Sequence, residues 1–407
     1  MILGVLALAA TQSFGQQIAG PWTGQLDLGA QKLTLVLHFD KDASGKDVCT
    51  IDSPDQSAKG IPATLNFISA DSVNIAVPSI GMTYAGKLEA GVLKGTFSQM
   101  GMNLPLDMKP GVVKHNRPQH PVELYPYQDK EIAFQNEAAN AWFAGTLVYP
   151  EGYKEGDKVP VLIMVTGSGA ENRDEEIFDH KPFLVIADYL ARHGIATLRY
   201  DDRATAKSVG GDVENATTED FMRDAAAGVE YLRSRKAFGK TGVLGHSEGG
   251  SIAFMLGARK KTDFIVSLAG PGVKGDTLLA AQNNMILVLS GQPATMTVET
   301  LRRQTAVQNM PWVKWFIDYD PSDDISKTRC PVFALNGDLD CQVISIQNLP
   351  AIRQLLPSSK RNLIKEYPSL NHLFQHCTTG LPDEYGQIEE TLSPEVLSDI
   401  AEWINWL

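Results

Sequence analysis

Short runs of alternating polar and apolar residues fill the first part of the chain, from about residue 18 to residue 112. Turns that contain glycine or aspartate separate these runs, and regularly spaced short strands of this kind indicate a small β-sandwich or barrel. The runs that predict strands are residues 22–28, 32–39, 72–77, 83–88 and 92–97. We therefore predict a small all-β domain over residues 16–114.

Three prolines lie within residues 115–129, and this composition predicts an extended, Pro-rich linker. From residue 130 to residue 407, short apolar runs alternate with stretches of helical periodicity. Such alternation indicates a mostly parallel sheet with helices on both faces. Two extended stretches come first, at 131–135 and 142–148, and the apolar runs follow at 160–165, 196–200, 242–244, 263–268, 331–335 and 362–367. The helical stretches are 183–192, 218–236, 247–259, 344–356 and 394–407.

A long insertion separates the predicted strands 263–268 and 331–335, and residues 277–290 and 298–308 have helical patterns within it. In this architecture ligands bind outside the carboxyl ends of the strands. We therefore predict that residues 273–318 form a helical lid over a ligand site. Its apolar residues would pack the lid and shape an acyl pocket: Leu278, Leu279, Met285, Ile286, Leu287, Met310, Trp312, Trp315 and Phe316.

One glycine-rich stretch carries a chemical signature. Gly245-His-Ser-Glu-Gly249 reads G-x-S-x-G, between an apolar run and a helical stretch. A strand, a sharp turn and a helix are the context in which this motif forms a nucleophile elbow, with the serine at the tip of the turn. Glycine permits the tight turn because it has no Cβ. Ser247 is thus the candidate nucleophile, and the alternative is a glycine-rich turn that happens to contain a serine.

A serine hydroxyl needs a general base, and the base needs an acid group that orients it. The expected order along an α/β-hydrolase chain is serine, aspartate, histidine. Asp340 follows the fifth of the apolar runs and is the candidate acid, with Asp338 as its rival. His372 follows the next run and is the candidate base, with His376 as its rival. His246 is too close to Ser247 in the chain to point its ring easily at the hydroxyl.

The negative oxygen of a tetrahedral intermediate needs preorganised hydrogen-bond donors. One donor is expected to be the backbone N–H of Glu248, the residue after the nucleophile. The second is expected from the loop after the strand 160–165, which reads Thr166-Gly-Ser-Gly-Ala170. We predict that the backbone N–H of Ser168 is this second donor, against the alternative of a flexible glycine turn.

Several motifs together resemble one family. They are Thr166-Gly-Ser-Gly, Asn172-Arg-Asp, His180-Lys-Pro-Phe, Arg199-Tyr-Asp-Asp-Arg, Gly245-His-Ser-Glu-Gly-Gly, Gly337-Asp-Leu-Asp and Leu370-Asn-His-Leu-Phe. Over roughly residues 130–407 the chain is similar to a bacterial α/β-hydrolase esterase family, close to the serine aminopeptidase and dienelactone-hydrolase branches. The β-rich front resembles an extension that some of these esterases carry. The resemblance implies Ser247, Asp340 and His372 as a catalytic triad, hydrolysis of carboxylic esters, and no cofactor.

The chain departs from that family at one loop. Relatives read R-Y-D-x-R-G-x-G-x-S, whereas this chain has Ala204 and Ala206 at the two glycine positions. Alanine tolerates a positive φ poorly, so the path of this loop is open to question. Charged residues in and near the motif predict a structural ion-pair network beneath the site: Arg173, Asp174, Arg199, Asp201 and Arg203.

The composition adds limits on partners and location. The 407 residues suffice for two domains, and 43% hydrophobic with 21% charged residues is ordinary for a soluble globular protein. A net charge of −12 argues against binding nucleic acid or anionic lipid. The apolar start, with small residues at 13 and 15, predicts a signal peptide over residues 1–15, although a basic leading segment is missing. It is too short to span a bilayer, and export to the periplasm or the exterior is the expectation.

The chain has four cysteines, too few for a fold built on disulfides. Cys341 follows the candidate acid and Cys377 lies five residues past the candidate base. A disulfide between them is a hypothesis, because the sequence cannot show whether their Cα atoms lie within bridging distance. The two cysteines with His372 and His376 could also be read as metal ligands, but the triad already accounts for His372 and no metal site is predicted.

These observations predict an exported serine esterase that forms an acyl-enzyme on short- to medium-chain acyl esters. The expected partner is a small-molecule ester, and a homodimer is possible. A peptidase or amidase with the same triad is the second hypothesis, but it should carry acidic groups in the lid, where Glu299 is the only carboxylate across residues 277–308. The third is a binding module in which the hydrolase part is inactive.

Overall fold

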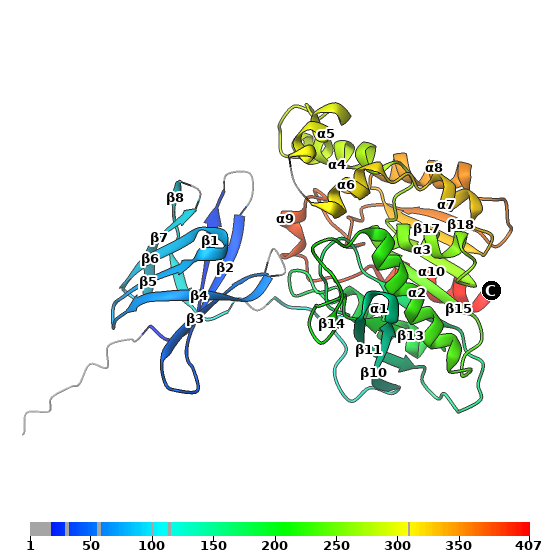
Figure 1. The fold of residues 1–407 in the computed structure, drawn as a ribbon, viewed down its shortest axis with the longest axis horizontal. Coiled ribbons are helices and arrows are strands. Elements are labelled where there is room, and N and C mark those ends of the chain that lie inside the picture. Colours follow the sequence, from blue (N-terminus) through cyan, green and yellow to red (C-terminus); the bar gives the residue numbers. More distant parts are fainter. Residues whose placement is uncertain (1–17, 29–31, 55–57, 100, 113–114, 308–309) are drawn as a thin grey trace, which may run out of the picture. The chain divides into compact units, whose positions relative to one another are not determined.

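The computed structural model describes residues 18–28, 32–54, 58–99, 101–112, 115–307 and 310–407. The chain divides into two units, Met1–Lys114 and His115–Leu407. Figure 1 shows that the first unit is built of strands and the second of a sheet with helices. The predicted signal peptide, residues 1–15, lies outside the described residues.

The first unit is a closed antiparallel barrel. Its strands pair in the order β6-β5-β4-β3-β2-β1-β9-β7-β8, and a further pairing of β6 with β7 closes the ring around eight of them, with β8 attached outside the ring. The sequence predicted either a sandwich or a barrel, and the structure forms the barrel. The strands are β1 (Gly20–Asp27), β2 (Lys32–Lys41), β3 (Asp47–Ser53), β4 (Ala58–Ile68), β5 (Ser72–Val77), β6 (Met82–Glu89), β7 (Val92–Gln99), β8 (Met102–Pro105) and β9 (Met108–Pro110).

Alternating side chains fill the interior of the barrel. On β5 every second residue is buried, which is the two-residue period expected of a strand with one face in a core. Trp22 and Tyr84 are fully buried there. The Tyr84 hydroxyl donates to the backbone carbonyls of Leu93 and Leu106, each at 3.2 Å. A Cβ on Gly95 would lie 2.3 Å from the Tyr84 hydroxyl oxygen, so a glycine is needed beside this ring.

The predicted Pro-rich linker is a bound part of the second unit. Most of residues 115–127 lie outside helices and strands, but the Arg117 guanidinium donates to the carbonyls of Phe178, Gly386 and Ile388 at 2.7 to 2.9 Å. The Gln119 side chain likewise bonds to the backbone of residues 391 and 392. These side chains satisfy carbonyls and amides of distant loops, so the segment is held along the second unit.

The second unit is built on a mixed, mostly parallel sheet, as predicted. Its strand order is β10-β11-β13-β12-β15-β16-β17-β18, and a short strand β14 pairs with β11. Strands β10 and β11 run antiparallel to their neighbours, while those from β13 to β18 run parallel. The bounds are β10 (Gln128–Asn136), β11 (Ala141–Tyr149), β12 (Val161–Val165), β13 (Ala196–Tyr200), β14 (Val209–Gly210), β15 (Thr241–His246), β16 (Phe264–Leu268), β17 (Val332–Gly337) and β18 (Leu363–Tyr367).

Helices cover both faces of this sheet. Apolar residues of α2, α3 and α8 share one core cluster with the sheet, and those of α1 and α10 share the cluster on the other face. The helices are α1 (Pro182–Arg192), α2 (Thr218–Ser234), α3 (Glu248–Ala258), α8 (Ser345–Leu355), α9 (Pro382–Tyr385) and α10 (Pro394–Trp406). None of the helices in the described ranges combines the length and apolar character needed to cross a membrane.

The insertion between β16 and β17 is helical. It holds α4 (Gly275–Leu289), α5 (Val298–Ala306), α6 (Pro311–Asp318) and α7 (Ser322–Lys327), of which α4 to α6 lie together in yellow-green and yellow in Figure 1. Arg302 on α5 donates to Asp276 on α4 and to Asp318 on α6, at 2.8 and 2.9 Å. One guanidinium therefore ties three lid helices together.

The loop with the two alanines keeps the backbone that glycine would take. Ala204 has φ 53° and Ala206 has φ 48°, both in the left-handed region. Such a residue costs on the order of 1 kcal/mol relative to glycine. The loop is held at its end, because the Ser208 hydroxyl donates to the carbonyl of Asp201 at 2.7 Å and the Asp201 carboxylate accepts from the N–H of Lys207.

Candidate active site

The three predicted catalytic residues follow three strands of the parallel part of the sheet. Ser247 comes directly after β15, Asp340 shortly after β17, and His372 shortly after β18. Because parallel strands present their carboxyl ends at one edge of the sheet, the loops after these strands meet there. This edge holds the candidate site.

Ser247 stands on a strained turn between β15 and α3. Its backbone has φ 52° and ψ −117°, a conformation that non-glycine residues rarely adopt. A Cβ on Gly245 would lie 1.9 Å from the carbonyl oxygen of Gly249, and a Cβ on Gly249 would lie 2.2 Å from that of Val165. Only glycine fits these positions, so the motif that the sequence displays is the one that this turn requires.

Asp340 and His372 are hydrogen-bonded in a buried pair. The distance between His372 Nδ1 and Asp340 Oδ2 is 2.8 Å, and the two side chains are 5% and 0% exposed. The other oxygen of Asp340 accepts from the backbone N–H groups of Gln342 and Val343 at 2.8 and 2.9 Å. When Asp340 is a carboxylate, the proton of a neutral His372 therefore sits on Nδ1, which leaves Nε2 able to accept one.

The two rival residues have other partners. Asp338 accepts from the backbone N–H of Ser369 at 2.6 Å, as expected of an aspartate that caps a turn. His376 is exposed and pairs with Glu390 at 2.8 Å. The structure thus brings Asp340 to His372, and it leaves Asp338 and His376 with separate bonds.

Ser247 and His372 both line one cavity of about 250 Å³. The lid contributes Leu278 and Leu279 from α4 and Trp312 and Phe316 from α6 to its wall. These are four of the lid residues that the sequence analysis proposed for an acyl pocket; the other five are not among the lining residues. The candidate nucleophile and the candidate base thus share a cavity with apolar side chains of the lid.

The two predicted oxyanion donors lie beside Ser247. Ser168 lines the cavity, on the loop after β12 whose neighbouring residue Gly167 donates its N–H to Glu175 Oε1 at 2.9 Å. Glu248 is the first residue of α3, and the first N–H groups of a helix have no carbonyl partner inside that helix. The role of these two N–H groups as donors to a substrate oxygen stays a prediction.

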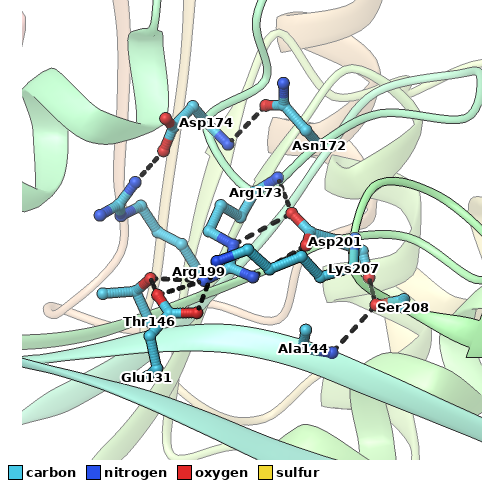
Figure 2. A network of polar contacts seen from close by, with 10 residues as sticks. All are labelled: Glu131, Ala144, Thr146, Asn172, Arg173, Asp174, Arg199, Asp201, Lys207 and Ser208. Atoms are coloured by element: carbon cyan, nitrogen blue, oxygen red, sulfur yellow. Dashed lines mark hydrogen bonds and ion pairs between the residues drawn. The ribbon is translucent and has the colours of Figure 1, made fainter. Parts of the chain in front are cut away.

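An ion-pair network anchors the loop that carries Glu171 and Glu175. Arg173 donates to both carboxylate oxygens of Asp201, at 3.0 and 2.8 Å, and to Glu131 and Thr146, each at 2.7 Å, as Figure 2 shows. The neighbouring pair of Arg199 and Asp174 is also drawn there. Arg203, the fifth residue predicted for this network, instead pairs with Asp224 at 2.7 Å in a separate buried contact.

His246, which the sequence excluded as the general base, is hydrogen-bonded to the loop of His372. Its Nδ1 lies 2.9 Å from Glu175 Oε1 and its Nε2 lies 3.0 Å from the backbone carbonyl oxygen of His372. Burial alone would lower the pKa of His246, but the Glu175 carboxylate and the carbonyl of His372 outweigh burial and raise this pKa. A protonated His246 thus donates to both groups, and it joins the loop after β12 to the loop of the candidate base.

Replacement of Glu175 with Gln is expected to destabilise the chain in a pH-dependent way. The pKa of His246 is raised in the folded chain, so its ion pair with Glu175 stabilises the fold fully below the ordinary histidine pKa of about 6.5. That contribution is lost as the pH rises through the raised pKa. We expect a loss of about 1–3 kcal/mol in the free energy of unfolding at pH 6 and a smaller loss at pH 9.

Urea denaturation of the full chain at the two pH values measures this effect. The control is Glu137→Gln, since Glu137 is exposed on the same unit. Its free energy of unfolding is expected to match that of the unchanged chain at both pH values. Equal losses for Glu175→Gln at pH 6 and pH 9 would contradict the assigned ion pair.

Sequence reasoning missed the acidic residues of the cavity. Glu171 and Glu175 both line it, and both lie just after the Thr166-Gly-Ser-Gly motif. A half-buried aspartate, Asp202, accepts from the backbone N–H of Glu171 at 2.9 Å. Burial raises the pKa of Asp202 to about 8. The signal in the sequence was a series of acidic residues directly after the glycine-rich loop at the end of a strand. Side chains at such a position can point into the site.

The four cysteines are free thiols, so the hypothetical disulfide between Cys341 and Cys377 is not formed in this structure. The Cys341 thiol donates to the carbonyl of Gly380 at 3.2 Å, and that of Cys377 to the carbonyl of Ser369 at 3.7 Å. Across the described part of the chain, no three His, Cys, Asp or Glu side chains gather in a way that could hold a metal ion.

Comparison with known proteins gives a match to a family model and a match to a curated protein. The family model described as "Serine aminopeptidase, S33" matches residues 181–357. Esterase EstD of Thermotoga maritima is 28% identical in an alignment 300 residues long, and the alignment covers 69% of this chain and 70% of that protein.

Solved structures with similar chains include the esterase PF2001 of Pyrococcus furiosus, with a TM-score of 0.48 and 18% identity over 73% of this chain and 99% of that chain. Another is Est1E of Butyrivibrio proteoclasticus with ferulic acid bound, with a TM-score of 0.44 and 16% identity over 68% of this chain and 96% of that chain. The family match falls on the parallel sheet, the turn at Ser247 and the lid. The strand order and the tight turn at Ser247 are those of the α/β-hydrolase fold, and a β-barrel precedes this unit in the chain.

Proposed function

We propose that this chain is a carboxylesterase-type serine hydrolase in which Ser247 is the nucleophile, His372 the general base and Asp340 the group that orients the base. The observation that carries the proposal is the buried 2.8 Å hydrogen bond between His372 and Asp340, in a cavity that Ser247 also lines from a strained turn. The likeness to the esterase EstD supports an ester as the substrate.

The reaction begins with acylation of the serine. Ser247 Oγ attacks the ester carbonyl carbon while its proton moves to His372 Nε2, and the carbonyl oxygen becomes an oxyanion that accepts from the N–H groups of Ser168 and Glu248. Asp340 stabilises the imidazolium that forms. When the intermediate collapses, the bond to the alcohol oxygen breaks, and His372 gives its proton to the departing alcohol.

Deacylation repeats these steps with water. His372 Nε2 takes a proton from a water molecule as its oxygen attacks the acyl carbon, and the second tetrahedral intermediate uses the same two N–H donors. Collapse returns the proton to Ser247 Oγ and releases the carboxylic acid. No redox step occurs, and the net reaction is ester plus water to acid plus alcohol.

The size and lining of the cavity favour small acyl groups. Its volume of about 250 Å³ lies just below the roughly 300 Å³ at which pockets for drug-sized ligands begin. Leu278, Leu279, Trp312 and Phe316 give one wall an apolar surface. We therefore propose short- to medium-chain acyl esters as substrates.

An active-site serine phosphonate probe tests the chemistry directly. The full chain is expected to be labelled once, on the peptide that contains Ser247, with parallel loss of hydrolysis across a panel of aryl esters from acetate to decanoate. Peptide mass spectrometry locates the label. Absence of both labelling and hydrolysis would contradict the proposal and favour a binding module with an inactive hydrolase unit.

A serine aminopeptidase or amidase with the same residues is the second candidate. The match of residues 181–357 to a family model described by that activity favours it. The two candidates differ in the leaving group, an alcohol or an amine. Turnover of aminoacyl-arylamides at a higher kcat/KM than that of aryl esters would reverse the ranking.

A further inference from the structure

Glu171 places a carboxyl group without a protein partner in the wall of the catalytic cavity. Its side chain lines that cavity together with Ser247 and His372. Among the residues that the structure describes, none donates a hydrogen bond or offers a cation to this carboxyl group. Glu175, the other acid in the wall, is bound instead to His246 and to the N–H of Gly167. Glu171 is therefore the carboxyl group that a ligand in the cavity can engage.

The backbone of Glu171 is fixed, so this placement is built into the loop. Its N–H donates to Asp202 Oδ2 at 2.9 Å, and its carbonyl accepts from the N–H of Asp202 at 3.1 Å. The carboxyl oxygen lies close to the nucleophile, since a Cβ on Gly167 would lie 3.8 Å from Glu171 Oε1 and 3.4 Å from Ser247 Cβ. A group bound by Glu171 would sit beside the ester that Ser247 attacks.

The groups around Glu171 are acidic. Burial, together with Glu175, Asp202 and Glu248, holds the pKa of Glu171 well above its usual range, which favours the protonated carboxyl group in the absence of a cation. The described residues that line the cavity include no lysine or arginine. The only basic side chains among them are His246 and His372, which bond to Glu175 and Asp340. An ammonium group bound beside Glu171 would stabilise its carboxylate form and lower this pKa, whereas a bound carboxylate would raise the pKa further.

The lid side of the cavity suits a cation as well. Trp312 and Phe316 line it and stack on each other with ring centroids 5.1 Å apart. Aromatic faces attract ammonium groups, most strongly where water is excluded. Glu171 and these two rings thus line the same cavity, so an ammonium group bound there meets both kinds of group.

We propose that Glu171 is a specificity residue that selects esters carrying an ammonium group a few bonds from the scissile carbonyl. The proposal rests on the proposed ester hydrolysis and names its substrate class. The ammonium group contacts Glu171 while the carbonyl oxygen occupies the region between the N–H groups of Ser168 and Glu248. Neutral esters of the same shape lack this contact, and anionic esters are repelled.

Three methyl esters of nearly equal size test the selection with the full chain. The first two are the methyl ester of butanoic acid and the methyl ester of β-alanine, which has an ammonium group in place of the terminal methyl group of butanoate. The third is the monomethyl ester of succinic acid, which has a carboxylate at the same end. At pH 7.5 we expect kcat/KM for the β-alanine ester to exceed that for the butanoate ester by at least tenfold. The succinate ester is expected to be the poorest of the three.

The variant Glu171→Gln keeps the shape of the side chain and removes its ability to ionise beside a bound ammonium group. We expect it to lower the ratio of kcat/KM between the β-alanine and butanoate esters by at least fivefold. A merely structural role for Glu171 would change both substrates together and leave the ratio unmoved. The control is Glu299→Gln on the lid, which removes a negative charge from an exposed position outside the cavity lining and should keep the ratio of the unchanged chain.

A measurement on the unchanged chain guards against a variant that fails to fold. Propylammonium chloride should inhibit hydrolysis of the butanoate ester competitively, with an inhibition constant at least fivefold below that of 1-propanol. Equal inhibition by the two, or a β-alanine ester no better than the butanoate ester, would overturn the inference while ester hydrolysis stands. Hydrolysis of none of the three esters, nor of any aryl ester, would instead contradict the proposed function.

Discussion

Ester hydrolysis is expected to fall by about 10⁴- to 10⁶-fold in kcat/KM when Ser247 is replaced with Ala. Alanine removes the Oγ that would form the acyl-enzyme and changes little else, since its backbone can adopt the same φ of 52° at similar cost. Residual hydrolysis would come from binding and from the oxyanion donors alone. Initial rates with an aryl butanoate, on protein whose circular dichroism matches that of the unchanged chain, measure the loss.

Ser251 provides a matched control for this substitution. It lies on α3, four residues after Ser247, is fully buried, and its hydroxyl has no hydrogen-bond partner among the described residues. Ser251→Ala therefore loses no bond and is expected to keep kcat/KM within threefold. If Ser247→Ala kept more than a tenth of the activity, the nucleophile would have to be another residue.

The second large effect is expected at Asp340. Asparagine has the shape of aspartate, but its amide can donate to His372 Nδ1, which would move the imidazole proton to Nε2 and leave that nitrogen unable to accept one from Ser247. We expect Asp340→Asn to lower kcat by about 10⁴-fold at neutral pH with a small change in KM, since the orientation of the base changes and the cavity does not. Steady-state kinetics on aryl esters separates the two constants.

Asp338 offers the comparison for this experiment. It lies two residues away, and its carboxylate accepts from the N–H of Ser369 in the loop after β18. Asp338→Asn is expected to change kcat by less than threefold. A large loss with Asp338→Asn and a small one with Asp340→Asn would exchange the two assignments.

The parts of the site that rest on short motifs could be predicted from the sequence. The turn at Ser247 depends on residues only a few positions apart, and the collisions that side chains at Gly245 and Gly249 would cause explain why glycines mark it. The strands and most helices of the second unit were also readable, because each buries one apolar run or face. Asp340 and His372 could be proposed because residues after neighbouring parallel strands meet at one edge.

The rest depends on contacts between distant segments, for which a single sequence carries no local signal. His246 could be excluded as the base, but its bonds to Glu175 and to the carbonyl of His372 join loops that are 71 and 126 residues away. Arg203 stood in a charged motif and yet pairs with Asp224 on α2. Glu171 was one acid among several, and only the folded loop after β12 turns it toward Ser247.

The hydrogen bonds of segment 115–129 to residues near 390 determine the order in which parts of the chain can fold during synthesis. Every strand pairing of the barrel joins residues between 20 and 110, so that unit has all its partners as soon as this stretch has left the ribosome. Arg117 must wait, because the carbonyls of Gly386 and Ile388 are made some 270 residues later. The barrel can thus form early, whereas these hydrogen bonds of the second unit form only after residues 386 to 388 have been synthesised.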